Sequence, residues 1–231
     1  MNSTKLDFEQ RKQEVETYFS FLVILEDDEN TRLKYKKGET IVKERVSGTL
    51  QKILIANGFL LLYNLIEATV RNSILEIYYE IQDSNINFEM LSERLKKIWI
   101  KQETDKLKEG TFKQDTLRNQ VLDIAESVLK KESIALSQEN LDFSGNLDAQ
   151  KIRKLSHKFG FDEPQDGRNL ATIKNKRNRL AHGESTFSEI GRDFTVGELT
   201  SFKDETLIFL LDEVISKIEH FISHKKYIVG S

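Results

Sequence analysis

Apolar residues recur every three to four positions over most of this chain, which is the spacing of amphipathic helices. The first such segment runs from about Leu6 to Glu26. Its apolar side consists of Phe8, Val15, Tyr18, Phe19, Leu22 and Leu25. A longer helix is predicted from about Thr49 to Gln82, and its section from Ile53 to Ile66 is apolar nearly all round. That composition predicts burial on several sides, and part of this surface is a candidate dimer interface.

The remaining segments predict further helices and few strands. The polar, Lys-rich run from Asp27 to Gly48 reads as a connection with a short hairpin around Gly38. Weaker patterns predict helices near Phe88 to Lys101, Thr116 to Lys131 and Leu147 to Phe159, with a turn around Ser144-Gly145-Asn146. Thr195-Val196-Gly197-Glu198 has the sequence of a capping box and opens a last helix that reaches about Lys226.

Together these elements predict an all-α fold. The single proline, Pro164, and the large charged fraction agree with it. We expect one domain over residues 1–231, an elongated helical bundle with a long second helix and a long C-terminal helix. Residues 84–163 are our candidate for a mid-chain helical insertion.

The composition excludes several kinds of functional site. The absence of cysteine excludes a disulfide framework, thiol catalysis and Cys-type zinc sites. His220 and His224 have a spacing that can bind metal, but no acidic pattern completes a site, which favours packed or solvated histidines. We predict neither a metal nor a cofactor.

The sequence also bears on location. The stretch from Met1 to Gln10 is polar and lacks an apolar signal core, and we expect no run of the roughly 18 apolar residues that a membrane span requires. We therefore expect a cytoplasmic protein without a membrane partner.

The most informative stretch is Arg177-Asn178-Arg179-Leu180-Ala181-His182. It closes a predicted helix that runs from Asp166, a candidate N-cap, to His182, where Gly183 is a stop signal. At about 100° per residue, Arg177 falls within the apolar stripe formed by Leu170, Ile173, Leu180 and Ala181. A guanidinium aimed inward needs a carboxylate, a cleft with water or an anionic ligand. Asn178 and His182 lie one turn apart on the flank of that stripe.

Two structural interpretations stand beside a catalytic one. Arg177 can be an ion-pair partner whose stem packs and whose head reaches solvent. His182 can simply complement the helix dipole at the C-terminal end. Alternatively, Arg177 holds a phosphate and His182 exchanges a proton near neutral pH.

In this stretch an arginine is followed by a polar residue, three more residues and a histidine. This order resembles the motif of the HEPN superfamily (higher eukaryotes and prokaryotes nucleotide-binding). The segment from Ala56 to Asn72 is similar to the long second helix of a prokaryotic HEPN branch, and the C-terminal helix fits as well. The resemblance implies a metal-independent endoribonuclease, often of toxin-antitoxin or phage-defence type, whose site forms between two protomers. Its catalytic residues would be Arg177, Asn178 and His182. The alternative is a non-catalytic HEPN protein that binds a nucleotide or anion, or an antitoxin-like interaction protein.

The same resemblance, together with charge, suggests auxiliary residues and partners. Glu67 and Arg71 on the long second helix either form an intrahelical ion pair or orient the motif from a facing helix. Although the net charge is −3, basic residues flank the motif. Those that we expect to bind RNA are Arg168, Lys174, Lys176 and Arg179. A second basic helix carries Lys151, Arg153, Lys154, His157 and Lys158. Instead of binding phosphates, the basic residues of both helices can form an ordinary solvated face. Expected partners are an RNA substrate and a second copy of the chain, or else a cognate antitoxin or paired HEPN protein.

Overall fold

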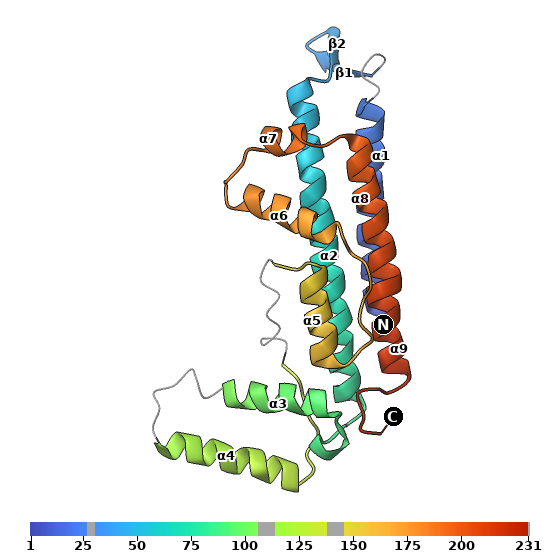
Figure 1. The fold of residues 1–231 in the computed structure, drawn as a ribbon. Helices are drawn as coiled ribbons and strands as arrows, with labels where there is room; N and C mark the ends of the chain where they lie inside the picture. The colour runs from blue at the N-terminus through green and yellow to red at the C-terminus, as the bar shows by residue number, and fades with distance from the viewer. Residues whose placement is uncertain (27–30, 106–113, 138–145, 231) are drawn as a thin grey trace.

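Three long helical segments run side by side and give the molecule its elongated shape (Figure 1). The computed structural model describes residues 1–26, 31–105, 114–137 and 146–230. The long segments are α1 (Asn2–Glu26), α2 (Gly48–Asp83) and a C-terminal segment. The last one comprises α8 (Val196–Ile208), a π-helical stretch (Phe209–Ile215) and α9 (Ser216–Ser223). The mostly helical bundle predicted from the sequence is confirmed, and the two long helices begin and end within four residues of the predicted positions.

The centre of the bundle is α2, which packs against α1, α6, α7 and α8. Its side chains at Ala56, Phe59, Leu62, Tyr63 and Ile66 are fully buried. Five of the six residues predicted on the apolar side of α1 are buried as well, and Tyr18 is half-buried. The prediction that α2 is buried on several sides is therefore confirmed.

The composition of α2 corrects one expectation from the sequence. Of the described helices, α2 alone is long and apolar enough to cross a membrane by length and composition, since its most apolar 18-residue window has a mean hydropathy of 1.7. The expectation that no segment reaches that composition is wrong. However, 56% of that window is buried within the structure, as is common for the core helix of a bundle.

A two-stranded antiparallel hairpin extends beyond one end of the bundle (Figure 1). Its strands are β1 (Arg32–Lys37) and β2 (Thr40–Arg45), and Gly38 turns the chain between them with a φ of +63°. Glycine adopts this positive φ without steric cost because it has no Cβ. The hairpin leads directly into α2, whose N-cap Ser47 accepts a hydrogen bond from the Leu50 amide. The hairpin predicted around Gly38 is confirmed.

The opposite end of the bundle carries the helices of the mid-chain region. They are a short 3-10 turn (Phe88–Met90), α3 (Glu93–Asp105), α4 (Gln114–Leu129) and α5 (Ala149–Phe159). In Figure 1, α3 and α4 project sideways from the lower end of α2, whereas α5 lies along α2. The predicted helices are confirmed, and the predicted turn at Ser144-Gly145-Asn146 lies largely outside the described residues. That residues 84–163 are an insertion stays a prediction.

Two shorter helices follow α5, namely α6 (Leu170–Ala181) and α7 (Phe187–Arg192). Asp166 is not the N-cap of α6, because Asn169 occupies that position, and Asp166 instead adopts a φ of +59° and pairs with Arg168. The helix α7 was not predicted from the sequence, although Thr186 and Glu189 form a complete capping box at its start. The capping box predicted for α8 at Thr195 and Glu198 is confirmed.

Candidate functional site

Arg177 lies over the face of a tyrosine from the central helix. Its guanidinium carbon is 4.5 Å from the centroid of the Tyr63 ring, which is fully buried, while Arg177 itself is half-buried. The prediction that Arg177 is aimed toward the core is therefore confirmed. A cation over an aromatic face is attracted by the ring quadrupole, and this holds the planar guanidinium in one orientation.

The side-chain amide of Asn178 accepts a hydrogen bond from Arg177 and links it to a second amide. Its Nη1 donates a hydrogen bond to Asn178 Oδ1 at 3.0 Å, and Asn178 Nδ2 donates to Asn146 Oδ1 at 3.2 Å. Within the described parts of the chain, Arg177 forms no ion pair with a carboxylate. Its positive charge is thus desolvated in part but not neutralised, which favours an anionic ligand at this position.

The Tyr63 hydroxyl accepts a hydrogen bond from the Leu147 amide at 3.1 Å, which ties the segment before α5 to the centre of α2. Burial raises the pKa of Tyr63, the Glu67 and Asp148 carboxylates raise it further, and the Leu147 amide and Arg177 oppose them. Tyr63 therefore stays a neutral phenol near neutral pH and acts as an aromatic platform rather than as an anion. Tyr63 and Asn146 were not predicted as site residues from the sequence. The only signal for Tyr63 was its position one turn before Glu67 in an otherwise apolar stretch.

His182 caps the C-terminal end of α6 and its side chain is exposed. Its backbone amide donates to the Asn178 carbonyl at 2.9 Å, and Gly183 then ends the helix with a φ of +69°. Five residues of α-helix place His182 roughly 7.5 Å beyond Arg177 along the axis. Solvent and a ligand can both reach the imidazole, which suits a group that exchanges a proton.

Glu67 and Arg71 do not form the intrahelical ion pair considered from the sequence, as far as the described residues show. Glu67 is half-buried on α2 one turn beyond Tyr63, close enough to influence the Tyr63 hydroxyl. Arg71 is exposed one further turn along the helix. In the described part of the molecule neither residue hydrogen-bonds to Arg177 or His182, and their auxiliary role stays a prediction.

The cations expected to bind RNA around the motif each have a partner within the chain. Arg168 pairs with Asp166 at 3.1 Å, and Lys174 pairs with Asp148 at 2.5 Å. Lys176 lies 3.7 Å from Asp193 and 4.9 Å from the centroid of the Phe194 ring, and Arg179 donates to Ser185 Oγ at 2.6 Å. On α5, Arg153 and His157 both approach Glu163. Arg177 differs from Arg168, Lys174 and Lys176 because no carboxylate pairs with it in the described regions. Arg179 likewise has no described carboxylate partner, but it is exposed, whereas Arg177 is half-buried.

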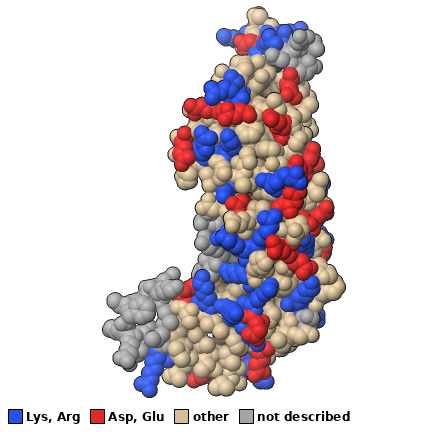
Figure 2. Space-filling model, viewed as in Figure 1, with Lys and Arg blue, Asp and Glu red and all other residues tan. Residues whose placement is uncertain are grey.

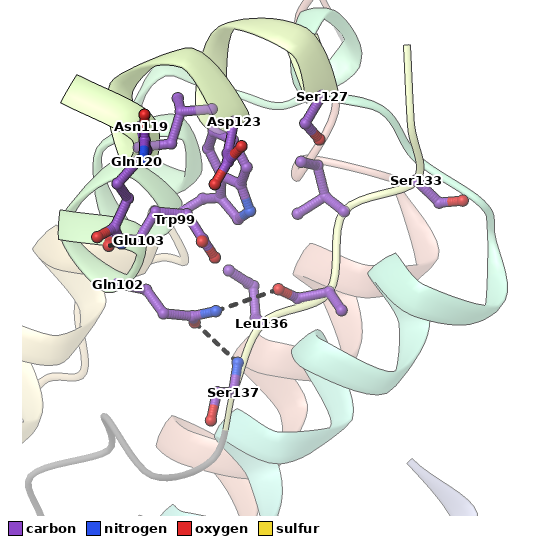
Figure 3. A pocket seen from close by; sticks show the side chains of 13 residues that line it. Trp99, Gln102, Glu103, Asn119, Gln120, Asp123, Ser127, Ser133, Leu136 and Ser137 are labelled. Carbon is purple, nitrogen blue, oxygen red and sulfur yellow. Dashed lines mark hydrogen bonds between the residues drawn. The ribbon is translucent and has the colours of Figure 1, made fainter. Parts of the chain in front are cut away.

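A separate cavity of about 810 Å³ lies between α3 and α4 (Figure 3). Trp99, Gln102 and Glu103 line it from α3, and Asn119 and Asp123 line it from α4. Gln102 is buried and donates to the Ala135 carbonyl while accepting from the Ser137 amide, so its amide is already satisfied. None of the predicted site residues lines this cavity.

His220 and His224 lie with their ring centroids 3.9 Å apart on the last helix. Both are exposed. Over residues 1–26, 31–105, 114–137 and 146–230, no cluster of three or more His, Cys, Asp or Glu side chains is placed to hold a metal ion.

Comparison with known protein families places the chain in context. The model of a family described as MAE_28990-like HEPN matches residues 3–227, which is nearly the whole chain. No curated protein and no solved structure matches the chain.

Proposed function

This chain belongs to the MAE_28990-like HEPN family, and on that premise we propose that it is a metal-independent endoribonuclease acting through Arg177, Asn178 and His182. Nuclease activity and nucleotide binding are the functions that a HEPN domain suggests. The observation that carries the proposal is the state of Arg177. It is half-buried, stacked on Tyr63 and hydrogen-bonded to Asn178, yet no described carboxylate neutralises it.

The proposed reaction is attack of an RNA 2′-hydroxyl on the adjacent phosphorus. The bond from O2′ to phosphorus forms, the bond from phosphorus to O5′ breaks, and the products are a 2′,3′-cyclic phosphate and a 5′-hydroxyl. His182 takes the proton from the 2′-hydroxyl or gives one to the leaving oxygen. Arg177 stabilises the charge that develops on the phosphoryl oxygens, because its planar fork of donors matches them.

Asn178 has a positioning role in this proposal. Its Oδ1 accepts from Arg177 and its Nδ2 donates to Asn146, so its amide is fixed at both ends. An amide fixed in this way orients the guanidinium without adding negative charge beside a phosphate. The exposed edge of Arg177 and the exposed imidazole of His182 are then presented by the same helix end.

A second copy of the chain fits this chemistry. One motif supplies one imidazole, whereas in-line transfer benefits from a base and an acid on opposite sides of phosphorus. We therefore propose that two motifs face each other in a dimer, acting on RNA in the cytoplasm. Roles in a toxin-antitoxin or phage-defence system belong to the same proposal.

The test is cleavage of total RNA and of a defined tRNA by the purified protein in EDTA, with the ends of the products mapped. Arg177→Ala and His182→Ala are compared with Arg192→Ala, which changes an exposed arginine on α7 outside the proposed site. Circular dichroism confirms that each variant is folded. We expect the parent and Arg192→Ala to leave cyclic-phosphate ends, and the two site variants to be at least about 100-fold slower.

Two results would contradict the proposal. One is undiminished cleavage by a folded His182→Ala protein, and the other is cleavage that leaves 3′-hydroxyl ends. Tight binding of a mononucleotide without any RNA cleavage would instead favour the non-catalytic HEPN class.

A further inference from the structure

The hairpin formed by β1 and β2 has one face made almost entirely of cations. Side chains alternate between the two faces of a strand, and residues directly opposite each other share a face. Arg32, Lys34 and Lys36 of β1 therefore lie on one face with their partners Arg45, Lys43 and Ile41 of β2. We call the five basic residues of this set the cationic face: Arg32, Lys34, Lys36, Lys43 and Arg45.

Two cross-strand pairs on this face join like charges, namely Arg32 with Arg45 and Lys34 with Lys43. Like charges placed directly opposite each other destabilise a hairpin. The acidic residue of the strands, Glu44, lies on the other face, where it accepts a hydrogen bond from the Tyr35 hydroxyl at 3.0 Å. The strands therefore provide no carboxylate on the cationic face to offset the repulsion.

The lysines of the cationic face are exposed and carry no ion pair among the described residues. These are Lys34, Lys36 and Lys43, and our inference rests on them. Arg32 donates to the Thr31 carbonyl, and Arg45 has a contact of its own within the chain. The acidic residues Asp27, Asp28 and Glu29 precede the hairpin in sequence and lie outside the described residues.

We propose that the cationic face binds the phosphate backbone of the RNA substrate. This deepens the proposed function and rests on it. Along each strand the cationic side chains repeat every ~6.8 Å, and the two strands lie ~4.8 Å apart, which gives two parallel rows of charge. A nucleic-acid backbone is a continuous line of charge that such rows can follow.

A nucleic acid suits this face better than an acidic protein does. Protein interfaces are centred on buried apolar or aromatic residues and are depleted in lysine. Here Ile41 is the one apolar side chain on the face, and Leu33 and Tyr35 point to the other side. Contacts to phosphates fix the position of an RNA but do not read its sequence. The hairpin therefore holds RNA without selecting a sequence.

The position of the hairpin agrees with this role. Figure 2 shows Lys and Arg side chains gathered over the hairpin at the top of the molecule. The hairpin leads into α2 at Ser47, and Tyr63, which lies beneath Arg177, is 16 residues farther along that helix. At 1.5 Å per residue Ser47 and Tyr63 are roughly 24 Å apart along α2, and the hairpin extends beyond Ser47 (Figure 1). An RNA of about 20 nucleotides can reach both sites, and a dinucleotide cannot.

The test is the affinity for a labelled 20-nucleotide single-stranded RNA, measured by fluorescence anisotropy over a range of salt concentrations in EDTA. His182→Ala serves as the background so that the RNA stays whole. One variant adds Lys34→Thr, Lys36→Thr and Lys43→Thr, since threonine favours strands and removes the repulsion. The matched control adds Lys97→Gln, Lys101→Gln and Lys130→Gln. This lowers the net charge equally with exposed lysines, two on α3 and one directly after α4.

We expect the hairpin variant to bind RNA at least about tenfold more weakly at low salt, and the slope of log K against log salt to fall in magnitude by about 2 for three lost phosphate contacts. The control should change both quantities much less. Unchanged affinity and slope in the hairpin variant would overturn the proposal. A poly-glutamate probe that binds as tightly as RNA, and equally depends on the three lysines, would also overturn it.

Cleavage of a dinucleotide by the parent protein separates this proposal from the proposed function. If the dinucleotide is cut but the hairpin variant binds RNA as its background does, the nuclease stands and the hairpin proposal is wrong. If no RNA is ever cut but the hairpin variant loses RNA binding, the hairpin proposal stands and the nuclease is wrong.

Discussion

The segment around α6 and the β1–β2 hairpin are both rich in basic residues, but they use their charges differently. Around α6, Arg168, Lys174, Lys176 and Arg179 each bond to a neighbouring side chain. In the hairpin the lysines of the cationic face have no such partner among the described residues, and two pairs of like charges face each other. Internal partners fix the α6 cations in the fold, whereas the hairpin lysines are free to meet an external anion.

Within the α6 segment, Arg177 is set apart because it is half-buried and no described carboxylate pairs with it, whereas Arg179, which bonds to the Ser185 hydroxyl, is exposed. The partners of Arg177 are the Tyr63 ring and the Asn178 amide, neither of which cancels its charge. A run of basic residues in a sequence therefore does not reveal which cation is available to a ligand. The bonding partners of each cation in the structure show which one is available.

The largest effect is expected for Arg177→Lys, which keeps the charge but loses the planar fork and the stacking on Tyr63. We predict that the rate of RNA cleavage under single-turnover conditions falls about 100-fold, with RNA affinity nearly unchanged. Arg192→Lys on α7 makes the same chemical change outside the site and should leave the rate within about threefold of the parent. Equal losses in both variants would show that Arg177 is not special among the cations of this region.

Helix positions were predictable from the sequence because helical periodicity is local. The inward position of Arg177 followed from its angle relative to Leu170 and Leu180 and is confirmed. Tyr63 and Asn146 were not predicted as site residues, because they reach Arg177 and Asn178, respectively, from segments far away in the chain. No periodicity within α6 carries that information.

The two errors of local prediction have local causes. Asp166 was expected to cap α6, but the chain turns at Asp166 and Gly167 with positive φ, and the helix starts three residues later than the cap predicts. The short α7 was missed because six residues give too little hydrophobic periodicity. Its capping box at Thr186 and Glu189 was the available signal.

Between the hairpin and α6 lies α7, and a substitution there should disturb the spacing of the two regions. Gly191 packs so closely on α2 that an added Cβ would meet the Lys52 carbonyl oxygen at 1.8 Å. Because backbone must move, we predict that Gly191→Ala destabilises the protein by about 1–3 kcal/mol, measured by urea unfolding.

Gly197 on α8 provides the matched control for this prediction. An added Cβ there meets only Thr195 Oγ1, at 4.0 Å, and the residue is helical and exposed. Gly197→Ala should stabilise the protein by roughly 0.5–1 kcal/mol through helix propensity. If both variants changed stability in the same direction, the close contact between α7 and α2 would not explain the effect of Gly191→Ala.

Asp148 tests whether internal partners restrain the α6 cations. It caps α5 by accepting from the Lys151 amide and also pairs with Lys174. Asp148→Ala should cost about 1–2 kcal/mol, since both the cap and the ion pair are lost. Asp148→Asn keeps a capping side chain and should cost under about 1 kcal/mol. With Lys174 released, both variants should bind RNA more tightly at low salt, and weaker binding would contradict the assignment of Lys174 to the fold.

The pH dependence of Asp148 has a defined sign. Burial raises the pKa of Asp148, but the hydrogen bonds from Lys174 and the α5 amides outweigh it, and the pKa lies below its usual value. Its contribution to stability is therefore fully present above the ordinary Asp pKa of about 3.9 and is lost as the pH falls through the lower folded value. The stability difference between the parent and Asp148→Asn should shrink below about pH 4 in urea titrations.

The smallest effect, and the most direct test of the hairpin, is expected for Lys43→Glu. This change turns the like-charge pair with Lys34 into an attractive one and should stabilise the hairpin by about 0.2–1 kcal/mol. Amide hydrogen exchange in β1 and β2 would then slow by up to about fivefold. RNA binding should weaken, because the charge of one residue of the cationic face is reversed.

Lys37→Glu makes the same change of charge on the opposite face, where its cross-strand partner is Thr40. It should slow exchange less and weaken RNA binding less than Lys43→Glu does. If the hairpin had only a structural role, Lys43→Glu would stabilise it without weakening RNA binding. Weaker RNA binding by a more stable hairpin would therefore show that its repelling cations serve a ligand and not the fold.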